Sequence, residues 1–386
     1  MSSSAAFAQN AISGQVLRPG TSNDMPRIRA EFQDFLDHNL LALSPGMAVA
    51  IVDIRGPSYI NTSGVRTLGK SEPINAHTTF RLASLSKAFA SATTGVLVKE
   101  GKLGWDSKLS HYLPNINFKD PLRQQQISIR NILSNSTGLF PHAYTNMLED
   151  DVPYEKILPL FKKVDFVCDP GSCYTYQNVA YSFIGDVLQE VSGKQYSQLV
   201  QEKIFSPLQM NDASLSREAF VTNSNHASPH ERRQRHLRAT PVKQSYYSVA
   251  PAAGVNASIS DMEQWLQALL GKKPEVLPQD LLSALFTSQA TVKDRGFYRG
   301  QWRNVRSAGY GMGWRVFDYA GTQVIYHAGW VQGYHAEIVL IPSRGLGMAL
   351  LMNSDHTAGI AAVPRFLDIS LGLDHSLSLV SEPANH

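Results

Sequence analysis

The sequence predicts an α/β (α+β) fold in which an antiparallel sheet, flanked by helices, is built from both ends of the chain. Strand-like apolar segments occur near residue 50 and again after about residue 310. Between them, helical patterns are separated by loops that contain Pro and Gly. This order favours one α/β lobe, about 24–103 and 281–375, which carries an inserted, mainly helical lobe at about 104–280.

The first hundred residues predict two helices and a pair of strands. Apolar residues at helical spacing indicate a helix over Asp24–Asn39, with Asp24 as its cap. Two strands follow, over Gly46–Ile54 and Tyr59–Thr67, joined through a Gly-Pro turn. A second helix begins near Ser84 and ends near Gly101, which suits a helix stop.

The rest of the chain predicts further helices and then four strands. Ser260 and Glu263 form a capping-box pattern at the start of one of these helices. The expected helices are 178–191, 195–205, 260–270 and a final one near 360–371. The expected strands are 313–319, 322–327, 335–341 and 346–352.

Composition predicts a globular protein that neither binds nucleic acid nor spans a membrane. The 386 residues are 43% apolar and 17% charged, with a formal net charge of only +3. The densest basic segment, Arg232–Arg238, is interpreted as a solvated loop. No apolar stretch approaches the roughly 18 residues needed to span a bilayer. We expect residues 24–386 to form a single domain.

Two features indicate export. Residues 1–23 are expected to be flexible, and Ser4–Gln9 is similar to the end of a secretory signal, where small residues precede cleavage. Cys168 and Cys173, the two cysteines of the chain, are separated by a segment with Pro-Gly at its centre, which can bring them to bridging distance. In a periplasmic or secreted protein we expect a disulfide. Two cysteines alone cannot complete a zinc site.

Ser84 and Lys87 carry the first chemical signal. Three residues are close to one helical turn, so both side chains project from one face and can meet. At a helix N-terminus, the backbone amides and the helix dipole stabilise negative charge beside the serine oxygen. This arrangement suits a serine nucleophile with a lysine partner.

Two further motifs follow Ser84 and Lys87 in the sequence, and their order is informative. Tyr176-Gln177-Asn178 precedes an apolar helix, and His327-Ala328-Gly329 ends a predicted strand. With the Ser84 motif, this order resembles the serine β-lactamase and penicillin-binding-protein superfamily. The closer likeness is to class C β-lactamases and their esterase and peptidase relatives, and it implies a β-lactamase/transpeptidase-like fold.

The connecting sequence supports this resemblance over roughly residues 25 to 372. Ile129–Leu139 is similar to a family segment in which Asn135 replaces the usual histidine. Three further segments are also similar to the family: Arg81-Leu82-Ala83, Pro251–Val255 with Ser260-Asp261-Met262, and Tyr310–Trp314.

The resemblance implies the catalytic roles. Ser84 attacks a carbonyl carbon and forms an acyl-enzyme. Lys87 or Tyr176 takes the serine proton, and Tyr176 also relays a proton to the leaving group. Burial and nearby positive charge lower a lysine pKa, which such a base requires. Because the groups titrate together, the sequence leaves the identity of the base open.

Further residues are implied to bind substrate. Asn178 holds Lys87 and the substrate amide, caps the following helix, or does both. The oxyanion hole consists of the backbone N–H groups of Ser84 and Trp330, the latter following Gly329 on an edge strand.

The third motif departs from the family. Many β-lactamases have Lys-Thr-Gly or Lys-Ser-Gly, whose cation and hydroxyl engage the β-lactam carboxylate, where this chain has His327 and Ala328. Histidine is mostly neutral at pH 7. We therefore expect activity on an anionic β-lactam to fall as His327 deprotonates.

The predicted function is a serine acyl hydrolase, with β-lactam hydrolysis first. Ester hydrolysis and D-Ala-D-Ala carboxypeptidase or D-amino-acid peptidase activity are alternatives, because the fold does not determine the substrate. A penicillin-binding sensor that acylates with little turnover is another. We expect a monomer acting on a small molecule, without cofactor or metal; His226 and His230 lie in a loop-like segment unsuited to zinc.

Overall fold

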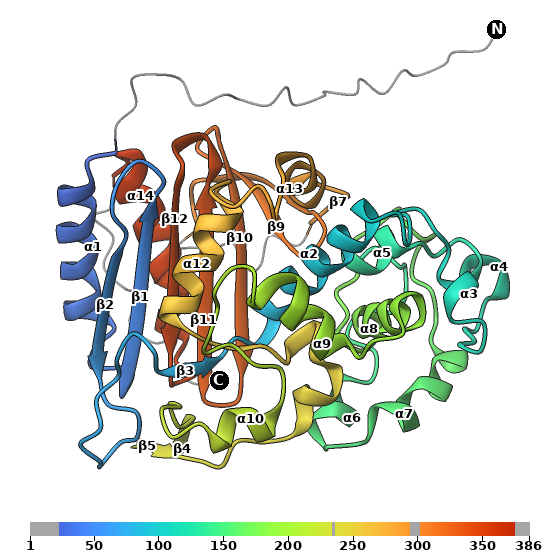
Figure 1. Cartoon of the computed structure of the whole chain (residues 1–386), viewed down its shortest axis with the longest axis horizontal. Coiled ribbons are helices and arrows are strands. Elements are labelled where there is room, and N and C mark those ends of the chain that lie inside the picture. Colours follow the sequence, from blue (N-terminus) through green and yellow to red (C-terminus); the bar gives the residue numbers. More distant parts are fainter. Residues whose placement is uncertain (1–22, 234–235, 294–301, 375–386) are drawn as a thin grey trace, which may run out of the picture.

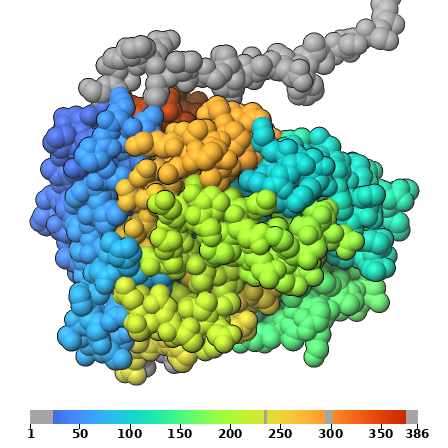
Figure 2. All heavy atoms as spheres, viewed as in Figure 1, coloured from blue at the N-terminus to red at the C-terminus, as the bar shows by residue number. Residues whose placement is uncertain are grey.

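A computed structural model describes residues 23–233, 236–293 and 302–374. The segment that resembles a signal therefore lies outside the described residues. In Figure 1, a large sheet with helices on both faces adjoins a mainly helical region. Atoms of the two regions meet along a broad boundary on the face shown in Figure 2.

The sheet contains eight antiparallel strands, in the order β2-β1-β12-β11-β10-β9-β8-β7. Its first two strands come from the N-terminal part of the chain and the others from the C-terminal part, which confirms the predicted fold class. The strands are β1 Gly46–Asp53, β2 Tyr59–Gly64, β7 Ala290–Thr291, β8 Val305–Tyr310, β9 Arg315–Tyr319, β10 Thr322–Val331, β11 Tyr334–Ile341 and β12 Leu346–Met352. Pairs β3 Thr79–Arg81 with β6 Asn256–Ser258, and β4 His230–Arg233 with β5 His236–Ala239, lie outside it.

Helices cover both faces of the sheet. On one face lie α1 (Met25–Asn39) and α14 (Ala362–Leu371), and their apolar residues share a core with β1 and β12. On the other face, α12 (Ile259–Leu269) packs on β1 and β12. Because strands β1, β11 and β12 are covered on both sides, they are buried along their whole length.

The helical region surrounds α8 (Val179–Ser192), whose apolar face is buried. The other helices lie around α8 and between this region and the sheet (Figure 1). They are α2 Ser86–Lys99, α3 Leu109–Tyr112, α4 Pro121–Gln124, α5 Ile129–Leu133, α6 Thr145–Glu149, α7 Tyr154–Ile157, α9 Tyr196–Val200, α10 Arg217–Thr222, α11 Ala250–Ala253 and α13 Gln279–Phe286.

Two local predictions were wrong. The capping box of α12 uses Ser258 and Asp261 rather than Ser260 and Glu263, because the Ser258 hydroxyl accepts from the Asp261 N–H and the Asp261 carboxylate accepts from the Ser258 N–H. The basic segment is a hairpin, β4–β5, rather than a loop, although Arg232 and Arg238 are exposed as expected.

Candidate active site

Ser84 lies in a tight turn between β3 and α2. The turn is a 3₁₀ segment over Ala83–Leu85, and the α-helix begins two residues after Ser84. Ala83 has a φ of +47°, a costly conformation for a residue with a side chain. The Ser86 hydroxyl donates to the Ala83 carbonyl (2.6 Å) and accepts from the Val255 N–H (2.9 Å). These bonds support the strained turn that presents Ser84.

Lys87 is fully buried beside Ser84. Its Nζ is 2.8 Å from the Asn178 side-chain oxygen, 3.1 Å from the Ala252 carbonyl oxygen and 3.5 Å from Ser84 Oγ. Burial is the main cause that lowers the Lys87 pKa, and the positive charge of Arg315 lowers it further. Lys87 Nζ donates to the Asn178 and Ala252 oxygens, and Ser84 Oγ lies at its third position, where the lone pair of a neutral amine would point.

Tyr176 completes the arrangement around Ser84. Its hydroxyl lies 2.9 Å from Ser84 Oγ, and Lys87 Nζ lies 4.6 Å from the centre of its ring. The residues on both sides of Tyr176 are held by Asn135, whose carbonyl accepts from the Thr175 N–H and whose side chain accepts from the Gln177 N–H. Asn135 has a φ of +50°, a conformation that asparagine tolerates better than most residues. Its departure from the family pattern therefore has a positioning role.

The disulfide lies on the chain just before Tyr176. Cys168 and Cys173 are bonded, and the loop between them is tied to the Asn135 segment by the Gly171 N–H, which donates to the Ser136 carbonyl. Gly138 packs against the Cys168 carbonyl so closely that a Cβ would lie 2.2 Å from that oxygen. The predicted pairing of the cysteines is thus present in the structure.

Asn178 precedes α8, and the structure separates its two predicted roles. Its side chain makes no capping bond to the helix. Instead, its oxygen accepts from Lys87 Nζ at 2.8 Å. Holding Lys87 is therefore the role that the geometry favours.

His327 is a buried neutral residue. Its Nδ1 lies 2.7 Å from the Ala328 carbonyl oxygen, so Nδ1 carries the proton, and Nε2 accepts from the Tyr310 hydroxyl at 3.0 Å. Burial, with the charges of Arg315 and Lys87, lowers the His327 pKa well below its ordinary value. His327 is therefore uncharged near neutral pH, and the protonation on which binding of an anionic β-lactam was expected to depend is confined to acidic pH.

The end of β10 passes directly over the Ser84 turn. β10 is an inner strand rather than the predicted edge strand, but only its residues 322–326 pair with β9, so residues 327–331 extend beyond that neighbour. A Cβ on Gly329 would lie 2.1 Å from the Leu82 carbonyl oxygen. Only glycine lets the strand approach the turn this closely.

We therefore expect Gly329→Ala to lower kcat at least about tenfold, because displacing β10 by even ~1 Å moves the Trp330 N–H away from the reacting carbonyl. Rates of 4-nitrophenyl acetate hydrolysis test this prediction, and circular dichroism spectra show whether the variant is folded. Gly56→Ala is the matched control, since a Cβ there meets no atom within 4 Å. An unchanged rate in Gly329→Ala would contradict the close-approach argument.

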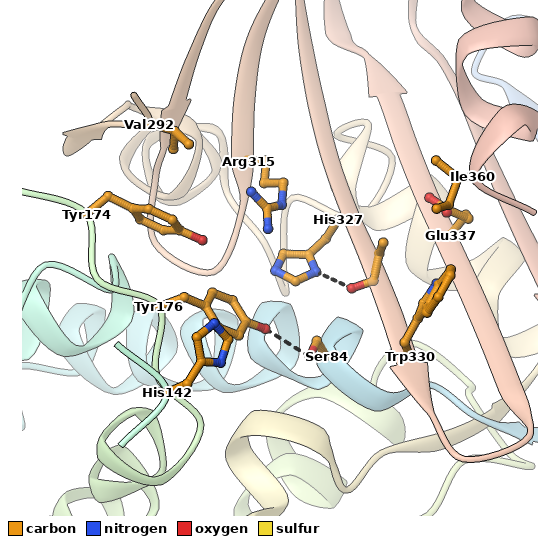
Figure 3. Close-up of a pocket in the computed structure, with 11 residues that line it drawn as sticks. Ser84, His142, Tyr174, Tyr176, Val292, Arg315, His327, Trp330, Glu337 and Ile360 are labelled. Atoms are coloured by element: carbon orange, nitrogen blue, oxygen red, sulfur yellow. Dashed lines mark hydrogen bonds between the residues drawn. The ribbon is translucent and has the colours of Figure 1, made fainter. Parts of the chain in front are cut away.

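The site opens into a pocket of about 410 Å³ (Figure 3). Ser84, Tyr176, His327 and Trp330 all line it, so the structure brings the three motifs together. In Figure 3 the Tyr176 hydroxyl points at Ser84, and His327 lies above them. The pocket is also lined by residues that the sequence reasoning did not single out: His142, Tyr174, Val292, Arg315, Glu337 and Ile360.

Arg315 is the most important of these residues for electrostatics. It lines the pocket and begins β9, directly after the family-like segment Tyr310–Trp314. That adjacency was the one sequence signal that could have revealed it. Its charge lowers the pKa of both Lys87 and His327. The cation of this site therefore comes from β9 rather than from the third motif.

Within the described ranges, no group of three or more His, Cys, Asp or Glu side chains is placed to hold a metal ion. Both ring nitrogens of His230 bond to backbone groups, the Leu68 N–H and the Asn353 carbonyl.

None of the helices described has both the length and the apolar character to cross a membrane.

Known proteins are similar in sequence to most of this chain. Unguisins hydrolase ungD' of Aspergillus campestris is 26% identical over 347 residues, 85% of this chain and 62% of the relative. Protein flp of Staphylococcus aureus (strain MW2) is 24% identical over 319 residues, 80% of this chain and 59% of the relative. The chain thus spans about three fifths of the length of these curated relatives.

Solved structures show the same fold. An octameric penicillin-binding protein homologue from Pyrococcus abyssi has a TM-score of 0.77 at 22% identity, covering 91% of this chain and 78% of that one. SurE has a TM-score of 0.71 at 20% identity, covering 92% and 78%. A family model described as Beta-lactamase matches residues 37–371. The chain therefore belongs to the Beta-lactamase family, within the superfamily of serine β-lactamases and penicillin-binding proteins.

Proposed function

We propose that this protein is a serine hydrolase that opens an amide or ester bond through an acyl-enzyme on Ser84. The observation that carries the proposal is the contact of Ser84 Oγ with both the Tyr176 hydroxyl and the buried Lys87 amine. A neutral Lys87 accepts the serine proton as Ser84 attacks the carbonyl. Tyr176, which bonds the same oxygen, is placed to pass a proton to the leaving group.

The oxyanion that forms in this step needs donors that are already in place. Ser84 stands at the start of α2, and its N–H is the first proposed donor. The Trp330 N–H, on the segment of β10 that Gly329 brings onto the turn, is the second. Water later attacks the acyl-enzyme and releases the product.

β-Lactam hydrolysis is the first candidate activity. A β-lactam presents its carboxylate near the third motif, where His327 is neutral and Ala328 has no hydroxyl. Arg315 is the pocket cation that supports this activity, since a guanidinium binds a carboxylate through two hydrogen bonds. Export to the periplasm or the medium accompanies this proposal and is supported by the disulfide.

Hydrolysis of an ester or a peptide is the second candidate. The neutral His327 and the methyl group of Ala328 favour it, because they remove the cation and hydroxyl that many β-lactamases use. One relative is an unguisins hydrolase, a hydrolase whose name does not refer to β-lactams.

A substrate panel tests the proposal: a penicillin, a cephalosporin, a 4-nitrophenyl ester and a D-Ala-D-Ala peptide, with Arg315→Gln as the variant. If β-lactams are substrates, Arg315→Gln raises their KM about 10- to 100-fold, the value of a lost charged hydrogen bond, whereas the KM of the neutral ester changes little. A lasting penicillin adduct in mass spectrometry would instead indicate a sensor. Absence of any turnover and any adduct would refute the proposed function.

A further inference from the structure

Glu337 is a buried carboxylate with one unused oxygen. It lies in the middle of β11, a strand otherwise almost entirely apolar, and its side chain is 1% exposed. One oxygen, Oε1, is 2.6 Å from Nε2 of His335. The other oxygen, Oε2, has no hydrogen-bond partner among the described residues. Burying an unsatisfied carboxylate oxygen is costly, so its retention calls for a partner.

The pocket that contains Ser84 reaches this carboxylate. Glu337 is one of its lining residues, with Ala328 and Trp330. In the sheet, Ala328 stands directly opposite Glu337, and Trp330 stands directly opposite His335. All four side chains are therefore on one face of the sheet. Ala328 contributes only a methyl group, which leaves room between the pocket and the carboxylate.

An aromatic ring completes the surroundings. Trp330 is 39% exposed, and the centres of its ring and the His335 ring are 4.7 Å apart in an edge-to-face contact. In Figure 3, Trp330 and Glu337 lie on one side of Ser84, whereas Tyr174 and Tyr176 lie on the other. A carboxylate and a partly exposed indole that line one pocket are suited to an organic cation, which gains from both the charge and the ring.

Arg315 determines where such a cation can sit. It pairs across β9 and β10 with Tyr326, two residues before Ala328, and so lies on the same face of the sheet as Glu337. Its positive charge repels an ammonium group from that end of the pocket, and Glu337 attracts it to the other. The pocket thus has a positive charge at Arg315 and a carboxylate at Glu337.

We propose that Glu337 and Trp330 form a subsite that binds an ammonium group of the substrate. The inference rests on the proposed acyl-enzyme function, because it assigns the substrate class of the same pocket. The Glu337 Oε2 atom accepts a hydrogen bond from the ammonium group, or attracts it by charge alone if it has no N–H. The indole of Trp330 covers the other side of the ammonium group. Substrates with a positively charged amine near the scissile carbonyl are then preferred over neutral ones of equal size.

Matched substrates test this preference on each side of the scissile bond. On the acyl side, the pair is the 4-nitrophenyl esters of 6-aminohexanoic and heptanoic acids. On the leaving-group side, it is butyrylthiocholine and the 3,3-dimethylbutyl thioester of butyric acid. We expect kcat/KM to favour the cationic member of at least one pair about tenfold or more. The 6-hydroxyhexanoic ester separates recognition of charge from recognition of a hydrogen-bond donor.

Glu337→Gln is the decisive variant, since it keeps the size of the side chain and removes the charge. It should lower kcat/KM for the preferred cationic substrate about 10- to 100-fold and leave the neutral partner within about twofold. Equal losses on both substrates would mean a structural role for Glu337 and would overturn the proposal. No preference in either pair, or an equal gain with the hydroxy ester, would also overturn it.

A second variant and a control guard against misfolding. If Glu337→Gln does not fold, Trp330→Leu replaces it, because its side chain is partly exposed; the ratio of cationic to neutral rates should fall in the same direction. An unchanged ratio in that variant would overturn the proposal. Ser84-dependent turnover of the neutral esters tests the proposed function separately. If that turnover is absent, the function has failed rather than the subsite.

Discussion

Ser84→Ala is expected to abolish both covalent labelling and turnover of every substrate of this protein, by at least about 10⁴-fold in kcat. The reason is that the only oxygen contacted by both the Tyr176 hydroxyl and Lys87 Nζ in the described structure is Ser84 Oγ. Without it, no acyl-enzyme forms, and the remaining donors stabilise only direct attack by water. Mass spectrometry after incubation with a penicillin or a 4-nitrophenyl ester, alongside steady-state rates, measures the loss.

The matched control for this variant is Ser197→Ala, an exposed position on α9. It makes the same chemical change far from the motifs and should leave labelling and rates unaltered. A covalent adduct that persists in Ser84→Ala would place the nucleophile elsewhere and refute the assignment.

Lys87→Met is expected to lower kcat/KM about 10²- to 10⁴-fold, the usual contribution of a general base. Methionine has a similar length but cannot accept a proton. In the unmodified protein, burial lowers the Lys87 pKa. As the pH falls through that lowered pKa, Lys87 becomes protonated and the rate decreases; as the pH rises, the neutral amine and the activity return. The pH–rate profile should therefore lose or shift its acidic limb in Lys87→Met.

Two comparisons sharpen this prediction. Lys99→Met is the matched control, since Lys99 ends the same helix and is paired on the surface with Asp280. Tyr176→Phe removes the other candidate base while keeping the ring. If Lys87→Met retains the acidic limb and Tyr176→Phe removes it, Tyr176 rather than Lys87 accepts the serine proton.

Much of the site could be predicted because it depends on residue patterns within single elements of the chain. The spacing of Ser84 and Lys87 on one helical face depends on a single turn, and the structure shows the two groups within 3.5 Å. Asn178 was correctly associated with Lys87, although the choice between capping and holding required the folded contact at 2.8 Å. Six of the eight strands of the sheet followed from strand-like segments at both ends of the chain, whereas the short strand β7 and the strand β8 were missed.

The electrostatics could not be predicted in the same way. His327 was expected to titrate, but its pKa depends on burial and on Arg315, which is twelve residues away in the sequence and on the neighbouring strand. Glu337 was overlooked because nothing in its own segment marks it as part of a pocket. Register across β10 and β11 places it opposite Ala328.

By itself, the sequence determined the family, the order of the three motifs, the nucleophile position and the fold class. These properties depend on residue identity and on spacing within single elements, where the chain's own geometry places side chains together. Only the tertiary structure decided the charge state of His327, the source of the pocket cation and the position of the buried Glu337 beside the pocket. The charge and the solvation of a side chain depend on which strands become neighbours. Strand pairing in a sheet brings together residues that can be hundreds of positions apart in the sequence.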